Sequence, residues 1–545
     1  MLNRAKFSLS TEFISHFRLL HIEKKSVQDF LSSPYRIILI SIFTILFLPH
    51  VFVVVRDINF VLAYEIDPGS IIQSILSLYQ HYYNMNAAYH SSYYGWTYYV
   101  INFLLLAPVY IAQKLNIIPD DYYFFFVGIR FIFFLIGLSA ILAYYEVAKR
   151  LLRNLFLSFT AALLLIASPV VFSHFYILHP ESTGLLFLLL GILSLLNFND
   201  GRAEDHRWYT VGLISLVLSA LSKQVFFITA LPVLFLFYYL HCHYHNMSIF
   251  KFAFTRRFAQ ILLFTILLSI IVFFIINPFA FIQPKVFIAN QMTMFSTQTN
   301  GSVSHTEAIK IWLQMIKTIP IIYVSIALSP FTLLGAIILG RDQKIGKIFY
   351  IVNIVSSVLY VIMISISARY LIQSVYFLPI YPFLILNLLG IALFIIRKSN
   401  IALIKLLVII PLSYFLFFVL IADFSVTIPA GYTRLMYKDT QIYKVYSYIE
   451  ENIPYGSKIA YDNNVALPSN KGLIGCHYWQ GCGTDYIEVF QPDYVIFSET
   501  WKFNGKTLPQ TARLIKYIND HHFILVDTIS YGNNDPVSVW KKPGP

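Results

Sequence analysis

Two carboxylates in the first long polar interval of the chain are the strongest candidates for chemistry. Glu65 and Asp67 lie directly before a stretch with helical periodicity. A carboxylate can act as a general base that takes the proton of an attacking hydroxyl group. Asp67 also precedes Pro68, so it can be the N-cap of a helix with proline at its first position. The two roles are compatible, because a capping carboxylate is held in place.

The stretch after these carboxylates has two distinct faces. Ile71, Ile75 and Leu78 fall on one side, and polar residues such as Gln73 and Gln80 recur on the other at steps of three and four. This spacing predicts an amphipathic helix. It is too polar to cross a bilayer and suits a position in the membrane surface.

Further ionisable residues stand beside apolar runs, where charges are costly and therefore indicate function. On one predicted side of the membrane they are Asp57, Glu65, Asp67, His174, His179, Glu181, Lys223 and Arg369. Converging carboxylates and cations suit a reaction in which a hydroxyl loses its proton and an anion leaves. Lysine and arginine can hold a phosphate leaving group, and arginine offers a bidentate fork.

Each of these residues also has a simpler explanation. Glu181 follows His179 and Pro180, and a glutamate in the first turn of a helix is favoured by the helix dipole. Lys223 can extend its amine to the membrane interface, and Arg369 can pair with a lipid phosphate.

A second polar tract, His241-Cys242-His243-Tyr244-His245, resembles a metal-binding sequence. Its alternate spacing does not suit one helix face, and we assign no metal site.

The composition requires a membrane protein. Of 545 residues, 58% are hydrophobic and only 12% are charged, whereas soluble domains carry about 25% charged residues. The net charge of +12 therefore bears on membrane topology, and we expect no nucleic-acid partner. The sequence has no glycine-rich phosphate loop, zinc-ligand spacing or serine elbow, so it does not support nucleotide-driven chemistry.

Apolar runs predict about eleven transmembrane helices. They are 37–55, 122–145, 155–172, 183–197, 209–222, 225–240, 258–277, 312–339, 348–366, 371–396 and 401–421. The run Trp96–Gln113 is also apolar, but counting it as a span would reverse every later loop. We therefore interpret it as a helix at the membrane interface.

Lysine and arginine fix the orientation, because they concentrate in cytoplasmic loops. With residues 1–36 in the cytoplasm, alternate loops hold Lys149, Arg150, Arg153, Arg202, Arg207, Lys251, Arg256, Arg257, Arg341, Lys344, Lys347, Arg397, Lys398 and Lys405. The opposite loops hold few basic residues. The pattern predicts a transmembrane domain over 37–422, a first external loop over 57–121, and an external C-terminus.

From residue 423 the composition changes to that of a small α/β domain, 423–545. The alternation of periods predicts helices at 438–452 and 511–519, with strands at 458–461, 494–498, 523–529 and 537–541. The odd number of spans places this domain outside the cytoplasm. Cys476 and Cys482 could form a short disulfide loop in an oxidising compartment. A metal site there is disfavoured, since only His477 is near.

Taken in order, four of these stretches resemble the GT-C superfamily of membrane glycosyltransferases. The similarity is to the branch with protein O-mannosyltransferases and lipid A aminoarabinose transferases. The stretches are the acidic motif Glu65-Ile-Asp67-Pro-Gly-Ser with the Tyr-rich segment before Trp96, His179-Pro180-Glu181, Leu218-Ser-Ala-Leu-Ser-Lys223, and Arg369-Tyr370 with Leu378-Pro379 and Tyr381-Pro382. The chain departs from the family pattern in having Pro68 after Asp67 and a glutamate at 181.

The resemblance implies transfer of a sugar from a polyprenyl-phosphate donor to a hydroxyl of a lipid, glycan or protein acceptor, at the outer face of the cell membrane. Asp67 would be the general base of an inverting reaction, with Glu65 beside it, and Glu181 would assist. The phosphate would be held by Lys223 and Arg369. The remaining substrate-binding positions would be Tyr370, His179 and Trp96. A divalent metal is compatible with the family, and no ligands are assigned.

Two other classes of protein fit the composition. A transporter or flippase would place charges at mid-membrane in broken helices and show paired repeats, which this sequence lacks. An envelope polysaccharide polymerase or ligase would depend on basic residues and tolerate Asp67→Asn.

Overall fold

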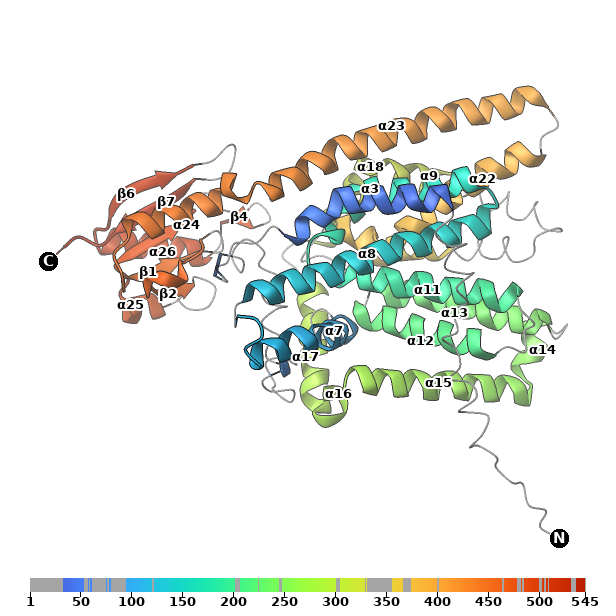
Figure 1. Cartoon of the computed structure of the whole chain (residues 1–545), viewed down its shortest axis with the longest axis horizontal. Helices are drawn as coiled ribbons and strands as arrows, with labels where there is room; N and C mark the ends of the chain where they lie inside the picture. The colour runs from blue at the N-terminus through green and yellow to red at the C-terminus, as the bar shows by residue number, and fades with distance from the viewer. Residues whose placement is uncertain are drawn as a thin grey trace, which may run out of the picture.

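A computed structural model describes most of the chain. The described residues are 33–52, 57, 59–60, 75, 78–79, 95–119, 122–200, 206–223, 225–244, 248–299, 304–328, 330, 355–365, 374–398, 401–462, 465–477, 482, 485–498, 502–503, 506–507, 509–530 and 536–544. A helical bundle is followed by a small sheet at the C-terminus (Figure 1).

The centre of the bundle is built from long apolar helices that pack side by side. Helix α11 packs against α12 and α8, and α8 also packs against α3 and α9; Figure 1 shows these helices with similar directions. Their bounds are α3 Pro34–Val51, α8 Tyr122–Leu152, α9 Leu155–Ala167, α11 Glu181–Asp200, α12 His206–Ser222 and α13 Val225–Tyr244. One large apolar cluster runs through all of them.

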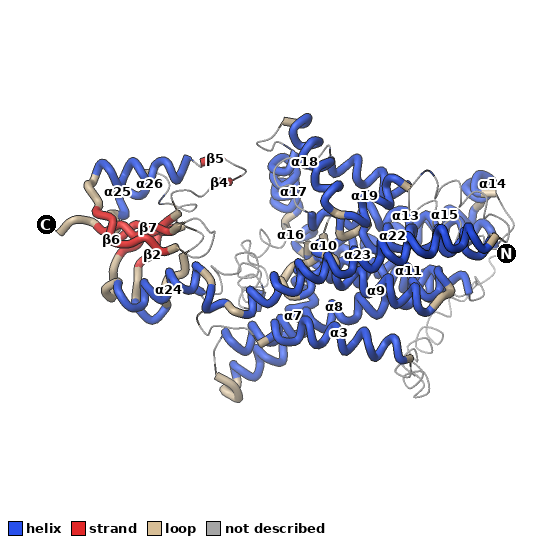
Figure 2. Tube along the Cα trace, turned by 90° about the horizontal axis from the view of Figure 1, so that it is seen from above, coloured by secondary structure: helices blue, strands red, loops and turns tan. Residues whose placement is uncertain are grey.

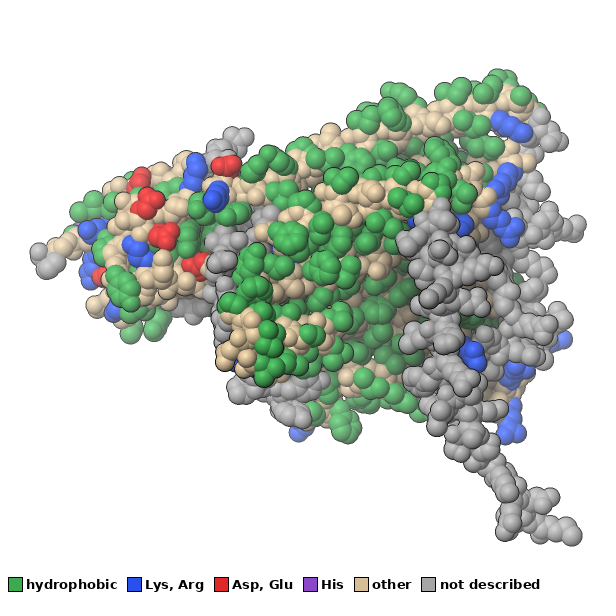
Figure 3. Space-filling view, viewed as in Figure 1, with side chains coloured by type: hydrophobic (Ala, Val, Ile, Leu, Met, Phe, Trp, Pro, Cys, Tyr) green, Lys and Arg blue, Asp and Glu red, His purple; other side chains and the backbone are tan. Residues whose placement is uncertain are grey.

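Later helices lie at the edge of the bundle. Helix α15 (Arg256–Ile276) and α23 (Ala402–Leu435) expose most of their apolar side chains, whereas α22 (Tyr381–Lys398) is largely buried. Figure 3 shows the resulting hydrophobic side face. Such a surface is unfavourable in water and suits contact with lipid.

Five described helices are long and apolar enough to cross a membrane, and the number is seven if each of two bent helix pairs counts as one span. Four shorter apolar helices lie at 207–222, 225–239, 355–365 and 381–397. Each predicted span overlaps one of these helices or pairs, and the count of eleven stays a prediction. The apolar run Trp96–Gln113, which was predicted to lie at the membrane interface, forms α7 (Trp96–Lys114). Helix α7 is not among the described helices that are long and apolar enough to cross a membrane.

Two breaks interrupt the predicted spans. Helix α9 turns by 65° into α10 (Pro169–Phe172) and the 3₁₀ turn η2 (Ser173–Phe175). Ser168 caps the new helix, with its Oγ accepting from Val170 N at 3.2 Å. Helix α18 (His305–Thr318) meets α19 (Pro320–Ala327) at 101°. The predicted span that begins at Trp312 is thus bent, because Pro320 starts a new helix instead of extending the old one.

Basic residues gather at one end of the bundle. Figure 3 shows lysine and arginine at the end away from the C-terminal sheet. Arg150 donates to Asn197 there, and Arg397 donates to the carbonyl oxygens of Leu152 and Arg153 at 3.2 and 3.3 Å. Arginine thus satisfies carbonyl groups at the C-terminus of α8, as the helix dipole favours.

The C-terminal α/β unit comprises the residues from α24 (Gln441–Asn452) to β7 (Val537–Lys541). Helix α23 continues past Asp423 to Leu435 before this unit begins. The sheet order is β2-β1-β3-β7-β6, with β1 parallel to β2 and β3, and β7 antiparallel to β3 and β6. The strands are β1 Lys458–Tyr461, β2 Ile474–His477, β3 Tyr494–Phe497 and β6 Ile524–Ile529.

Strand β3 is buried on both faces because helices cover both sides of the sheet. Val495 and Phe497 pack with α25 (Tyr486–Phe490) and α26 (Pro509–Asp520), while Tyr494 and Ile496 pack with α24. Figure 2 shows these helices on opposite sides of the strands. The open question about the two cysteines is answered: Cys476 at the β2 edge and Cys482 form a disulfide.

Candidate active site

The candidate site lies at the end of the bundle nearer the C-terminal α/β unit. Helix α11 begins there and α12 ends there, as the chain direction in Figure 1 shows. The turn η2 and a second 3₁₀ turn, η3 (Ser374–Phe377), contribute to the same end. Residues far apart in the sequence thereby come together at one face of the bundle.

Glu181 is the centre of a buried ionic cluster. Its side chain is 1% exposed, and its two carboxylate oxygens bind different partners. Oε1 accepts from Lys223 Nζ, and Oε2 contacts His179 Nδ1. The side chains of Lys223 and His179 are 16% and 14% exposed. A buried carboxylate requires such partners, so the three predicted residues form one unit in which Lys223 and His179 are the partly exposed members.

The sequence explains why α11 and α12 can bring these groups together. Ser219 Oγ donates to the carbonyl oxygen of Gly184 at 2.7 Å, which ties the two helices one turn from the ion pair. A Cβ at Gly184 would lie 2.5 Å from the ring of Phe226. The small-residue helix that ends at Lys223 therefore packs closely against the start of α11.

The start of α7 fastens the other side of α12. Thr97 Oγ1 donates to the carbonyl oxygen of Leu218 at 2.9 Å. Gly95 has a φ of +84°, and a Cβ there would lie 2.2 Å from the carbonyl oxygen of Leu221. Trp96 is 2% exposed in an aromatic cluster that also contains Leu178, beside His179. Trp96 is thus placed next to the elements of the site.

Two further residues lie beside the cluster: Tyr376, which was not predicted, and His174, which was among the predicted ionisable candidates but was given no role. Lys223 Nζ lies 5.6 Å from the centroid of the Tyr376 ring, an arrangement that attracts a cation. The Tyr376 carbonyl oxygen accepts from the hydroxyl of Tyr360. His174 lies in η2, with its ring centroid 5.7 Å from that of His179. For Tyr376, the one sequence signal was its position between the Arg369 motif and Pro379.

His174, His179 and Glu181 form a group that could hold a metal ion. One ligand atom from each residue lies within 4.8 Å of the other two. The sequence assigned no metal ligands, since the spacing of these residues matches no standard metal motif and the structure alone brings His174 to the other two.

Asp57, another predicted outer-face residue, connects the chain segment after α3 to the C-terminal α/β unit. Its Oδ2 accepts from the hydroxyl of Tyr446 at 2.8 Å and from the backbone N–H of Ser469 at 3.0 Å. Its Oδ1 accepts from Asn59 N at 2.9 Å. Burial, together with the hydrogen bond to Asp57, raises the pKa of Tyr446. The tyrosine therefore stays a donor over the neutral pH range.

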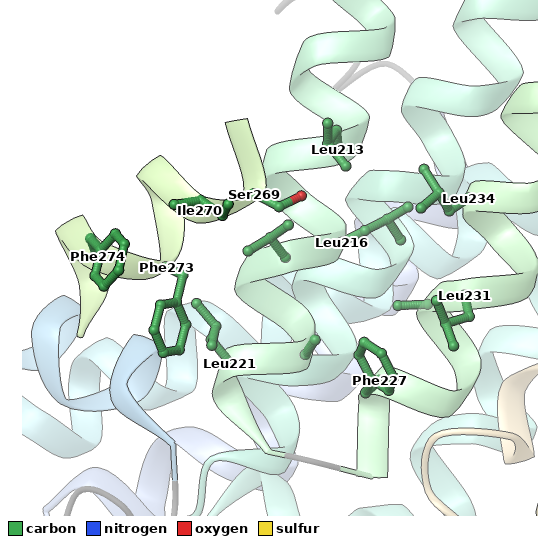
Figure 4. A pocket seen from close by; sticks show the side chains of 13 residues that line it. Leu213, Leu216, Leu221, Phe227, Leu231, Leu234, Ser269, Ile270, Phe273 and Phe274 are labelled. Atoms are coloured by element: carbon green, nitrogen blue, oxygen red, sulfur yellow. The ribbon is translucent and has the colours of Figure 1, made fainter. Parts of the chain in front are cut away.

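An apolar groove of about 540 Å³ lies between α12, α13 and α15. Figure 4 shows its side chains, which are leucine, phenylalanine, isoleucine, valine and alanine with Ser269 among them. Leu221 and Phe227 line it, so the groove reaches the chain segments on both sides of Lys223.

Four predicted site residues, Glu65, Asp67, Arg369 and Tyr370, lie outside the described residues. Among the predicted site residues that the structure describes, Glu181, His179 and Lys223 come together, and Trp96 lies beside their supporting helices.

Comparison with known protein families matches one segment of the chain. Residues 74–291 match the family model of dolichyl-phosphate-mannose-protein mannosyltransferase, which confirms the resemblance predicted from the motifs. This match includes His179, Glu181 and Lys223. No protein sequence of curated function matches the chain.

Two crystal structures of ArnT from Cupriavidus metallidurans are similar to the whole chain. The structure bound to undecaprenyl phosphate is 11% identical, with a TM-score of 0.48, covering 94% of this chain and 100% of that one. The apo structure is also 11% identical, with a TM-score of 0.47 and coverage of 93% and 98%.

Proposed function

We propose that the chain is a membrane glycosyltransferase that moves a sugar from a polyprenyl-phosphate donor to an acceptor hydroxyl. One observation carries the proposal: the segment that matches the mannosyltransferase family contains the buried Glu181 with Lys223 at its open side. A partly exposed cation, held by a buried carboxylate at the end of a membrane bundle, suits the phosphate of a lipid whose chain lies in the bilayer.

Lys223 is the proposed phosphate ligand. In the structure its amine binds Glu181 and lies over the Tyr376 ring. A donor phosphate has oxygens that can replace or share this contact, and charge-assisted hydrogen bonds to phosphate are among the strong ones. As the sugar leaves, negative charge grows on the phosphate, and Lys223 stabilises that charge. Glu181 and His179 position the amine, and Arg369 with Tyr370 completes the phosphate side.

Asp67 is the proposed general base, with Glu65 beside it. The acceptor hydroxyl loses its proton to the Asp67 carboxylate while its oxygen attacks the anomeric carbon. The bond between that carbon and the phosphate oxygen breaks with both electrons going to the polyprenyl phosphate. Attack from the opposite side inverts the configuration.

The apolar groove between α12, α13 and α15 is the proposed site of the isoprenoid chain. Its lining is almost entirely hydrocarbon, and burial of each CH₂ group is worth about 0.8 kcal/mol. Because Leu221 lies two residues before Lys223, a chain in this groove would have its phosphate end near the amine. The Trp96 region would cover the same side.

For topology, we propose the eleven spans and the order of domains predicted above, with the N-terminus in the cytoplasm and the C-terminal α/β unit beginning after α23. The first external loop and the C-terminal α/β unit then lie at the outer face of the cell membrane. The unit would recognise the acceptor, whose class (lipid, glycan or protein) is left to experiment.

The test is turnover by detergent-purified protein with labelled polyprenyl-phosphate sugars and a membrane extract as acceptor. Lys223→Met and Asp67→Asn should each lower transfer by 100-fold or more, the scale of removing one transition-state partner. Lys285→Met, a change of an exposed lysine on α17 (Pro284–Thr299), is the matched control and should keep full rate.

Label transfer that survives Lys223→Met would refute the phosphate role. Full transfer by Asp67→Asn would reduce Asp67 to a helix cap and favour Glu65 as the base. No transfer by the parent protein, together with movement of labelled lipid across vesicles, would instead establish a flippase.

A further inference from the structure

We infer that His174, His179 and Glu181 bind a divalent metal ion, with zinc as the best fit. The three side chains converge from η2, from the loop that precedes α11 and from the first residue of α11, and one ligand atom from each lies within 4.8 Å of the others. This inference concerns binding and does not depend on which group the protein transfers.

The set of donors selects the metal. Two imidazoles and one carboxylate suit zinc, copper, iron or nickel, whereas magnesium and calcium prefer oxygen ligands alone. Three protein ligands with a fourth position open is also a common arrangement of zinc in reactive sites. The side chain of Glu181 is 1% exposed and that of His179 is 14% exposed. The site is thus shielded from water on most sides, which strengthens charge interactions.

A neighbouring hydroxyl is placed to orient one ligand. Ser173 Oγ lies 2.9 Å from His174 Nδ1. Histidines that bind metals usually use their second ring nitrogen for such a hydrogen bond, which fixes the ring and its tautomer. With Nδ1 directed to Ser173, Nε2 of His174 is the nitrogen for the metal.

The Lys223 amine would compete with a metal ion for the Glu181 carboxylate. Its amine binds Glu181 Oε1, while Oε2 faces His179. A doubly charged ion at the two histidines and Oε2 would repel the lysine amine and take over its role as counter-charge to Glu181. Metal binding and the Lys223–Glu181 ion pair therefore oppose one another. An ion at this site would release Lys223 toward a phosphate group at the open side.

The experiment measures zinc binding by the full chain in detergent. The parent for the test carries His241→Ala, His243→Ala and His245→Ala and a histidine-free purification tag, which removes the other histidine-rich tract from the measurement. We expect one zinc ion per chain after dialysis, and binding that calorimetry follows.

Two variants should weaken zinc binding and a third should strengthen it. Glu181→Gln and His174→Ala should each weaken zinc binding by at least tenfold. Lys223→Met should strengthen it by about tenfold, because the competing cation is gone. His50→Ala is the matched control: His50 is also buried and stacks on Tyr176 at 4.4 Å, and this change should leave zinc binding unaltered.

Zinc binding that is absent in the parent, or equal in Glu181→Gln, His174→Ala and the control, would overturn the inference. Weaker binding in Lys223→Met would overturn the competition between the metal and the lysine. Because each protein is checked for a single elution peak and a cooperative melt before dialysis, loss of fold is recognised separately. Glycosyl transfer is not a readout here, so failure of the metal site leaves the proposed function to its own test.

Discussion

Asp57 is predicted to hold the C-terminal α/β unit against the chain segment that follows α3. Its carboxylate accepts hydrogen bonds from Tyr446, Ser469 and Asn59, and the residue is 9% exposed. Phe60, three residues on, packs in a cluster with Tyr446. The perturbation is Asp57→Ala, which removes the acceptor and leaves the Ser469 N–H without this partner.

The cost follows from the geometry. A hydrogen bond to a charged group contributes about 1.5–3 kcal/mol, and such contributions do not simply add. We expect about 3 kcal/mol for Asp57→Ala, which is roughly a 100-fold change in the local opening equilibrium. Tyr446→Phe removes one of the hydrogen bonds and should cost about 1.5 kcal/mol, or roughly tenfold.

Hydrogen exchange of the full chain in detergent measures this opening. Peptides that include Ser469 should exchange roughly 100-fold faster in Asp57→Ala, while β3, at the centre of the sheet, should keep its protection. Asp485→Ala is the matched control, since the Asp485 carboxylate is fully exposed. Equal protection at Ser469 in Asp57→Ala and the control would refute the reasoning, and so would loss of protection throughout the sheet.

Three further expectations concern stability. Gly95→Ala should lower the melting temperature by several degrees, because its Cβ would meet a backbone carbonyl of α12; Gly456→Ala has a similar positive φ with nothing within 4 Å, and should cost only about 1–2 kcal/mol. Cys476→Ser should destabilise the C-terminal α/β unit by about 2 kcal/mol, and reductant should reproduce this loss in the parent but add nothing in the variant. Burial lowers the pKa of His477 to about 4, below its usual 6.5, so the unfolded chain takes up a proton that the fold excludes. Exchange protection of the sheet should therefore fall as the pH drops from 6.5 toward 4, and His477→Phe should flatten that dependence.

Helix and strand periods predicted much of the fold, because local hydropathy decides those elements. Strands β1 and β7 have the predicted bounds, and each predicted span overlaps an apolar helix or a bent pair. Strand β2 escaped prediction: Ile474–His477 is short, lies at the sheet edge and has no alternating pattern. Its position depends on pairing with β1 and on the disulfide from Cys476, which are non-local.

The sequence predicted which charged residues belong to the candidate site, but it did not predict the contacts between them. A charge beside an apolar run is visible in sequence because burial of that charge is costly, and this identified Glu181 and Lys223. Which charge binds which is set by tertiary packing. The Ser219 hydrogen bond to Gly184 and the position of Tyr376 under Lys223 depend on contacts between helices, so no local pattern could supply them.

The Asp57 hydrogen bond to Tyr446 also constrains the path of the chain. Asp57 precedes most of the bundle helices in the sequence and Tyr446 follows all of them, yet the two side chains form a hydrogen bond. If the bundle spans a membrane, the chain must cross it an even number of times between them, because both residues lie on one side. Eleven predicted spans less the first leave an even number. Counting the α7 run as a further span would leave an odd number and separate Asp57 from Tyr446 by a bilayer. With each of the other ten predicted spans crossing once, the hydrogen bond supports an interfacial α7 independently of where lysine and arginine fall.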